Sequence, residues 1–235
     1  MSSVNNTVTR IKSGEAIVEC LMRYSVGTTS TFMAGPLAGL SDKAAERAIS
    51  RLLADGSIES HPLKGPMRYY TLSAETARKR GIHDGRGSGT QAMGFQGLCQ
   101  NYAMTASCLF SSPQKQRLTR DEFASRFPMI CENARSIKHF RTRYFLDVSD
   151  RANGVVRLGL FVADLGQNLR RLVRKVRREV ERRRTTSFGP LIAERLFAPC
   201  VLTAFPKKAE QIQAALKDET FPVRVEVVAG LSDIL

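Results

Sequence analysis

The sequence predicts a two-domain protein of class α+β or α/β, with helices and a β-hairpin at the N-terminus and a C-terminal α/β domain whose helices flank a small mixed sheet. Three observations predict this class. Residues 37–72 change from helical periodicity to two short runs of strand-forming residues. Three Gly and one Ser fall within residues 83–90, which is typical of a flexible linker. After residue 140, strand and helix patterns alternate. We expect domains at residues 1–82 and 95–235, joined by a linker at 83–94.

The first domain is predicted to begin with polar, frayed residues 1–10, followed by a structural helix over residues 13–24. β-Branched and aromatic residues at 28–33 predict a short strand. Gly35-Pro36 should end that strand, and a short helix is expected over residues 37–40.

The first domain centres on a predicted helix over residues 41–54 and a hairpin behind it. Ser41 occupies the N-cap position, where its side chain would accept a hydrogen bond from the first turn. Asp55-Gly56 should end the helix, because glycine tolerates the left-handed conformation. The hairpin would pair residues 58–61 with 68–72 around a turn at 62–66. The apolar stripe of the helix comprises Ala45, Ala48, Ile49, Leu52 and Leu53.

Polar side chains of this segment fall outside the stripe, where they could contact base edges or phosphates. On the helix they are Ser41, Lys43, Arg47, Ser50 and Arg51, and on the hairpin they are Lys64 and Arg68. The run RLLADGSIE is similar to the winged helix-turn-helix of bacterial regulators. This resemblance covers roughly a third of the chain. It implies that the helix enters the major groove of double-stranded DNA and that the hairpin reaches the minor groove or the backbone. The alternative is a helix and hairpin used for packing or for docking a protein.

The charge balance favours a polyanionic partner. Lys and Arg number 36 against 22 Asp and Glu, the formal charge is +14 and the pI is about 10.1. Nucleic acid is the commonest such partner, and a solubilising surface charge is the alternative. The five Cys contain no C-x-x-C pair and the three His are scattered, so we expect reduced, mostly buried thiols, no metal and no cofactor. No signal peptide or membrane span is recognisable, and the expected location is the cytoplasm, on the bacterial nucleoid when DNA is bound.

Beyond the hairpin, Ser73 is predicted to start a helix that stops at Gly81. Gly85, Gly87 and Gly89 could be taken for a phosphate loop, but the G-K-[ST] ending and a preceding strand are missing. Thr119 is predicted to cap a helix in the second domain. The helices of that domain are expected over residues 95–110, 120–127, 165–184, 188–196 and 206–217, and its strands over 140–148, 155–163, 199–204 and 221–228.

The helix predicted at residues 165–184 is strongly basic. Its apolar stripe comprises Leu165, Leu169, Leu172, Val173, Val176 and Val180. Its cations, opposed in the helix by Glu179 and Glu181, are Arg170, Arg171, Arg174, Lys175, Arg177, Arg178, Arg182, Arg183 and Arg184. We expect the first six of these cations to contact nucleic-acid phosphates. A solvated or partner-facing helix and a membrane-surface helix are the alternatives.

The element order of the second domain is similar to the restriction-endonuclease-like fold. Active nucleases of that fold place an acid on one strand and a D/E-x-K triplet on the next, and these residues bind a metal that activates water. Asp147 matches the first acid, but strand 155–163 has no acid-x-Lys triplet and Asp164 stands only at its end. We therefore expect no catalysis. Together with the winged segment, residues 140–230 resemble the replication-relaxation proteins of plasmids and integrative elements.

These patterns predict a non-catalytic, sequence-specific, double-stranded DNA-binding transcription regulator of a mobile element. A homodimer is expected, because two-fold symmetry matches palindromic operators. The C-terminal domain would serve dimerisation, effector binding or further DNA contact. Two alternatives stay open. One is a replication or partition accessory protein of low sequence specificity that uses Arg170 to Arg184, and the other is a metal-dependent nuclease that uses Asp147 and Asp164.

Overall fold

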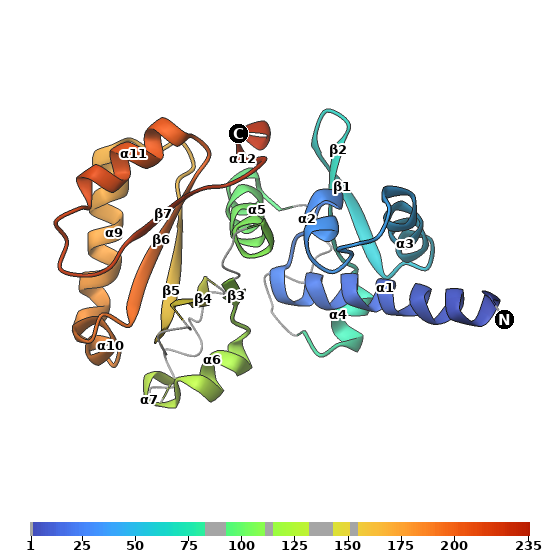
Figure 1. Cartoon of the computed structure of the whole chain (residues 1–235), viewed down its shortest axis with the longest axis horizontal. Helices are drawn as coiled ribbons and strands as arrows, with labels where there is room; N and C mark the ends of the chain where they lie inside the picture. The colour runs from blue at the N-terminus through green and yellow to red at the C-terminus, as the bar shows by residue number, and fades with distance from the viewer. Residues whose placement is uncertain (1, 83–92, 111–114, 132–142, 151–154) are drawn as a thin grey trace. The chain divides into compact units, whose positions relative to one another are not determined.

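The computed structural model describes residues 2–82, 93–110, 115–131, 143–150 and 155–235 (Figure 1). The chain divides into two compact units, one of residues 1–105 with Ile234 and one of residues 106–233 with Leu235. The division falls inside a helix, α5 (Phe95–Phe110). The predicted mixed α/β class with a small mixed sheet is confirmed. Most of the predicted linker lies outside the described residues.

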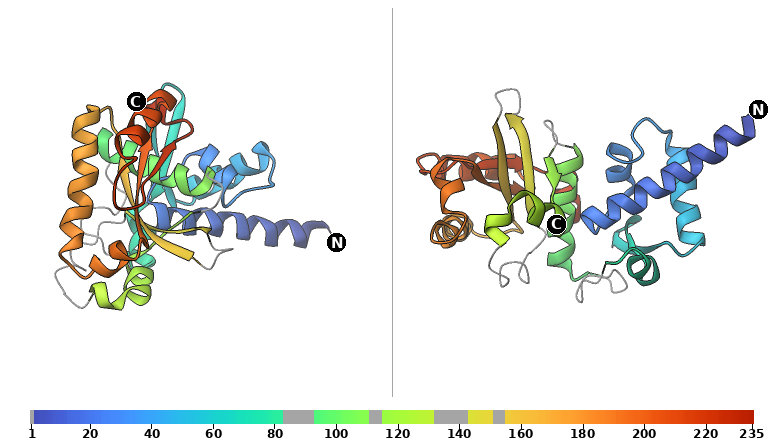
Figure 2. Two further views of the ribbon diagram at one scale, coloured as in Figure 1. Left: turned by 60° about the vertical axis from the view of Figure 1, so that its left-hand side comes forward. Right: turned by 90° about the horizontal axis from the view of Figure 1, so that it is seen from below.

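The first unit combines helices with a two-stranded antiparallel sheet. Its elements up to the division are α1 (Ser2–Tyr24), α2 (Thr29–Ala34), α3 (Asp42–Ala54), β1 (Ile58–Lys64), β2 (Met67–Leu72) and α4 (Ala74–Lys79). Figure 2 shows α1 as a long, straight helix. The buried core of the unit draws on α1, α2, the turn after α2, α3 and β1. It includes Ile17, Leu21, Phe32, Leu37, Ile49 and Ile58.

Three predictions for the start of the chain are wrong. The helix α1 begins at Ser2 rather than Ser13, since no Pro or Gly interrupts the residues before Ser13. Residues 28–33 form the N-cap and most of the helix α2 (Thr29–Ala34) instead of a strand, because the side chains of Thr28 and Thr31 close a reciprocal capping box. Strand pairing in this region is confined to a bridge between Gly27 and Tyr70, whose N–H and C=O groups exchange two hydrogen bonds. The residues predicted as a helix at 37–40 form a turn.

The helix α3 has the predicted extent but not the predicted cap. Ser41 stands at the N-cap with an extended backbone, yet its side chain makes no capping hydrogen bond. Its carbonyl oxygen instead accepts from the N–H groups of Ala44 and Ala45. The stripe is confirmed except for Leu53, which is 36% exposed. Gly56 ends the helix at φ +71°, as predicted.

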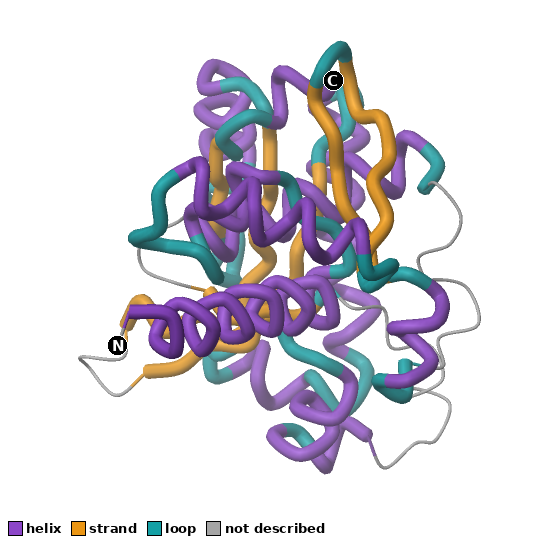
Figure 3. Tube along the Cα trace, turned by 90° about the vertical axis from the view of Figure 1, so that its right-hand side faces the viewer, coloured by secondary structure: helices purple, strands orange, loops and turns teal. Residues whose placement is uncertain are grey.

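The hairpin that follows α3 is longer than predicted. β1 and β2 pair from Ile58 opposite Leu72 to Lys64 opposite Met67, with an irregularity between Pro62 and Lys64. Figure 3 shows the hairpin as a narrow two-stranded ribbon that closes in a tight turn. The helix α4 starts after Ser73, as predicted, and the Ser73 side chain caps it by accepting a hydrogen bond from the N–H of Thr76. The start of α5 packs on the hairpin, where Leu98 contacts Val26 and Tyr69.

The second unit is built on a five-stranded sheet in the order β3-β4-β5-β6-β7. β3 to β5 are antiparallel neighbours, whereas β5, β6 and β7 are parallel. The strands are β3 (Lys115–Arg117), β4 (Tyr144–Asp150), β5 (Val155–Ala163), β6 (Phe197–Thr203) and β7 (Arg224–Val227). Gly159 lies at the middle of the sheet, where an added Cβ would stand 2.0 Å from the ring of Phe145.

Helices cover the face of the sheet that carries Leu146, Leu158 and Val201. Figures 1 and 2 show α9 running alongside the strands, with α11 beside it. The helices are α6 (Arg120–Arg126), α7 (Pro128–Cys131), α9 (Leu169–Arg184), α10 (Gly189–Ala193), α11 (Pro206–Ala215) and α12 (Leu231–Ile234). The predicted alternation of strands and helices is confirmed, including the cap of α6 by Thr119. The sequence patterns missed β3, α7 and α12, which have only three or four residues each.

The basic helix α9 begins at Leu169, four residues later than predicted. Gly166 adopts φ +83° and Asn168 caps the helix, so Leu165 precedes it and does not extend its stripe. No helix in the described part of the chain has the length and apolar character that crossing a bilayer requires. None of the five cysteines, all of which lie in the described residues, forms a disulfide, and burial is complete or nearly so for all except Cys131.

Candidate nucleic-acid interface

The predicted contact residues of α3 share its exposed surface. Lys43, Arg47 and Ser50 follow one another at helical spacing, and Arg51 lies beside them. All four are exposed, as is Ser41 at the helix start. Burial of the opposite stripe fixes this orientation, because Ala45 and Ile49 face the core. The surface can therefore present donors to a ligand without rearrangement of the helix.

The structure adds an acidic residue to this surface. Glu46 is exposed and lies one turn from Lys43 and one turn from Ser50. A glutamate on such a surface repels phosphates but can accept a hydrogen bond from the N4 amino group of cytosine. The position of Glu46 outside the apolar stripe follows from the sequence, but its negative charge does not indicate a phosphate contact.

The two predicted contact residues of the hairpin lie near its tip. Lys64 ends β1, and Arg68 pairs with Pro62 one step down the ladder. Both side chains are exposed, and Gly65 makes the turn at φ +56°. Lys64 lies six residues from Ile58, so the strand carries it about 20 Å from the base of the hairpin. His61, further down, stacks on Tyr69 at 4.8 Å and contacts the Thr71 hydroxyl, which gives it a packing role.

The helix α9 concentrates charge far more than α3 does. It carries nine Arg and Lys against two Glu, a net charge of +7 and half of the charge of the whole chain. The distribution along the helix is uneven. Residues 169–178 hold six of the cations and no acid, whereas residues 179–184 hold three cations and both acids. The positive charge of the helix is therefore concentrated in residues 169–178.

One predicted cation of α9 lies inside the unit. The Arg183 side chain is only 15% exposed, and its Nη1 donates to Glu179 at 2.7 Å. Its Nε donates to the Tyr144 hydroxyl, and its guanidinium lies within 6.0 Å of the rings of Phe188 and Phe197. Burial opposes ionisation of Glu179, but the hydrogen bond and charge of Arg183 outweigh it and lower the pKa of Glu179. Arg183 thus serves packing and not an external ligand.

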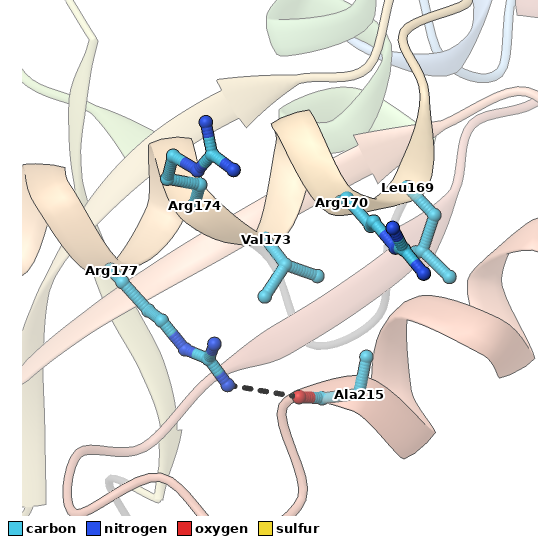
Figure 4. Close-up of a pocket in the computed structure, with 6 residues that line it drawn as sticks. All are labelled: Leu169, Arg170, Val173, Arg174, Arg177 and Ala215. Carbon is cyan, nitrogen blue, oxygen red and sulfur yellow. Dashed lines mark hydrogen bonds between the residues drawn. The ribbon is translucent and has the colours of Figure 1, made fainter.

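An open hollow of about 410 Å³ lies between α9 and α11. Its lining comprises Leu169, Arg170, Val173, Arg174, Arg177 and Ala215. Arg177 donates to Glu219 at 2.6 Å and to the Ala215 carbonyl at 3.5 Å. In Figure 4, Arg177 points toward Ala215, Arg174 points away from Ala215, and Arg170 lies beside Leu169. The guanidinium groups spread along the helix and do not converge on one point.

The remaining predicted cations, Arg171, Lys175 and Arg178, flank this hollow on the same helix. Arg171 and Arg178 are exposed and Lys175 is half-buried. Burial lowers the pKa of Lys175, and the nearby charge of Arg143 lowers it further. In the described parts of the chain, the side chains of Arg170, Arg171, Arg174 and Arg178 form no ion pair, so they can accept an external anion.

The two candidate catalytic acids do not meet. Asp147 on β4 pairs with Arg157 at the start of β5, and Asp164 follows the end of β5. Seven residues of an extended strand separate these positions by about 23 Å. Each acid also has a cation: Arg224 lies 2.8 Å from Asp147, and Lys208 lies 2.8 Å from Asp164. No group of three possible metal ligands exists within the described residues. These two carboxylates cannot hold one ion.

Asp164 instead stabilises the turn that follows β5. It accepts hydrogen bonds from the Thr203 hydroxyl and from the N–H of Gln167, besides the ion pair with Lys208. The Lys208 ammonium also donates to the Gln167 carbonyl. These bonds fix the turn between β5 and α9 and thereby the start of the basic helix.

Charged residues also gather on the sheet face opposite α9. Lys115 of β3 pairs with Glu226 of β7, which also accepts from the Ser107 hydroxyl at 2.6 Å. The nearby Cys200 thiol is buried, and burial together with the Glu226 charge raises its pKa well above the ordinary value. Burial likewise raises the pKa of Cys108 to about 12. A raised pKa lowers the fraction of thiolate, which is the nucleophilic form of cysteine.

Sequence periodicity could not have found the ion pairs that join β3 or β4 to β7, since the paired residues lie far apart in the chain.

Comparisons with protein-family models, with curated proteins and with solved structures returned no match for this chain.

Proposed function

We propose that the first unit is a winged helix-turn-helix and that the protein is a non-catalytic, sequence-specific regulator that binds double-stranded DNA as a homodimer. The observation that supports this most is the exposed surface of α3. Its core-facing stripe is buried while Lys43, Arg47, Ser50 and Arg51 all face solvent. Such a helix can enter the major groove, whose base edges carry a distinct donor and acceptor pattern for each base pair.

The hairpin supports the same proposal. Its tip carries Lys64 and Arg68 about 20 Å from the base of the strand pair, far enough to reach an adjacent backbone or minor groove. Lys43, Arg47 and Arg51 would supply base or phosphate contacts, and Glu46 would accept from a cytosine. The proposed location is the bacterial nucleoid.

The test is binding of the purified chain to the DNA upstream of its own coding region and to a scrambled duplex of equal length. We expect at least about a hundredfold preference for the upstream DNA. Arg47→Ala should weaken binding to the upstream DNA by about 1–3 kcal/mol and binding to the scrambled duplex by less. Equal losses on both duplexes would reduce Arg47 to a phosphate contact. Equal wild-type affinity for both duplexes would contradict the proposal.

The charge on α9 favours a second candidate function, a replication or partition accessory protein with little sequence preference. Equal binding of both duplexes that weakens together as salt rises would support it. A metal-dependent nuclease needs its acids to share a metal, which the separation of Asp147 and Asp164 opposes. Incubation of DNA with the protein and Mg²⁺ or Mn²⁺ tests that alternative, and cutting that Asp147→Ala abolishes would establish it.

A further inference from the structure

The two halves of α9 differ in how their cations are used. In residues 179–184, Arg183 is buried against Glu179, and Arg184 contacts Glu181 at 3.3 Å and the Thr220 hydroxyl at 3.3 Å. In residues 169–178, Arg177 contacts an acid, Glu219, which belongs to the segment after α11. Arg170, Arg171, Arg174 and Arg178 are exposed on the same half. The net charge is +6 over residues 169–178 and +1 over residues 179–184.

We infer that residues 169–178 of α9 form a second binding surface, for the phosphate backbone of nucleic acid, and that residues 179–184, which hold both acids of the helix, contribute little to it. The ligand is read without sequence preference, because the surface offers guanidinium groups for phosphates. This surface does not depend on the winged-helix assignment of the first unit.

The arrangement of the guanidinium groups indicates a polymeric anion. Arg170, Arg174 and Arg177 are spread over about 10 Å of helix axis. One strand of B-DNA passes about three phosphates in that distance. Figure 4 shows the three side chains fanning out along the helix instead of closing around one small anion. Repeated charges along a backbone match this spread.

Burial of the apolar side of α9 argues against a membrane as the ligand. Leu172 and Val176 are fully buried in the core of the second unit, and Val173 is 7% exposed. A helix that lies in a membrane interface must insert its apolar face among the lipids. On α9 that face is already occupied by the sheet.

Glu219 acts as an internal counter-ion of this surface. Its carboxylate lies 2.6 Å from Arg177 and its side chain is only 17% exposed, while the Arg177 side chain is 56% exposed. A backbone phosphate near the hollow would compete with Glu219 for the same guanidinium. Removal of the carboxylate charge should therefore make a further cation available to the nucleic acid.

The test uses the full chain and a short duplex of random sequence, with salt varied between about 50 and 200 mM. Arg170→Gln/Arg174→Gln should flatten the plot of log K against log salt by about two units of slope, since each lost phosphate contact removes about 0.9. The matched control is Arg182→Gln/Arg184→Gln, which removes the same net charge from the other half of the helix. Its slope should change by less than half as much. Equal changes in the two double variants would overturn the proposal.

Glu219→Gln should steepen the slope by up to about 0.9, because Arg177 is released to bind a phosphate. A flatter slope or weaker binding in this variant would contradict the role of Glu219. Binding of anionic phospholipid vesicles without binding of the duplex would overturn the proposal and show that the ligand of this surface is a membrane. Thermal unfolding of each variant shows that the fold is kept. If the wild-type protein shows no preference for the upstream DNA but its variants show these slopes, the proposed regulator function is wrong and the proposed surface on α9 is supported.

Discussion

Arg183 lies inside the second unit, where its guanidinium faces the rings of Tyr144, Phe188 and Phe197. Its substitution should therefore affect stability and not nucleic-acid binding. Arg183→Ala leaves a largely buried Glu179 without its cation, and we expect the free energy of unfolding to fall by about 3 kcal/mol. Arg182→Ala, at an exposed neighbouring position, should change it by no more than about 0.5 kcal/mol. Denaturant unfolding of the two variants measures both values, and equal losses would refute the structural role of Arg183.

The same pair predicts a dependence on pH. The pKa of Glu179 is lowered in the folded state, so the pair contributes its full stabilisation above the ordinary carboxyl value of 4.5. That contribution is lost as the pH falls through the lower folded pKa. The free energy of unfolding of the wild type should therefore decrease more steeply below about pH 4.5 than that of Glu179→Gln. Parallel curves for the two proteins would show that Glu179 does not titrate with folding.

At the scale of elements, Ser41 and Ser73 occupy the same N-cap position of two helices but differ in their hydrogen bonds. The Ser73 hydroxyl accepts from the N–H of Thr76, whereas the Ser41 side chain makes no capping bond to α3. Ser73→Ala should therefore lower the free energy of unfolding by about 1 kcal/mol. Ser41→Ala should lower it by clearly less, and urea unfolding of both variants is the measurement. A larger loss for Ser41→Ala would show that its hydroxyl caps α3 in solution.

Elements with a local signal were predictable. The cap at Thr119, the stop at Gly56 and the apolar strand β5 rest on residues close together in the chain, and the structure has all three. The segment at residues 28–33 was mispredicted because strand propensity of its side chains competes with a capping box that only the folded helix reveals. β3 escaped prediction because three residues carry no measurable periodicity.

For the candidate site, the exposed residues of each helix could be predicted from the sequence, but their partners elsewhere in the chain could not. Exposure of Lys43, Arg47, Ser50 and Arg51 followed from the apolar stripe on the other side of α3. The charge of α9 was equally plain, but its division into two halves was not. The acid that contacts Arg177 comes from Glu219, 42 residues later in the chain. A pattern within one helix cannot report such a partner.

At the scale of the whole molecule, ion pairs join distant strands of the second unit. Lys115 of β3 reaches Glu226 of β7, although three strands separate them in the sheet order. Lys115→Met should lower the free energy of unfolding by about 3–5 kcal/mol, because the Lys115 side chain is 2% exposed and Glu226 loses that cation. Lys115→Met/Glu226→Gln should recover part of the loss. A double-mutant cycle measures the coupling, and strictly additive losses would show that the two residues do not interact.

These pairs also have a consequence for the order in which the protein can acquire its structure during synthesis. Glu226 follows Lys115 by 111 residues, and Arg224 follows Asp147 by 77. A ribosome therefore completes α1 to α4 of the first unit long before the countercharges of the second unit exist. The first unit can fold while translation continues, whereas the sheet of the second unit must wait for its last strand. A messenger RNA truncated after the codons of α4 and before those of β7 would yield a chain that lacks Arg224 and Glu226. In such a chain, β3 and β4 would expose Lys115 and Asp147 to chaperones and proteases without these two countercharges.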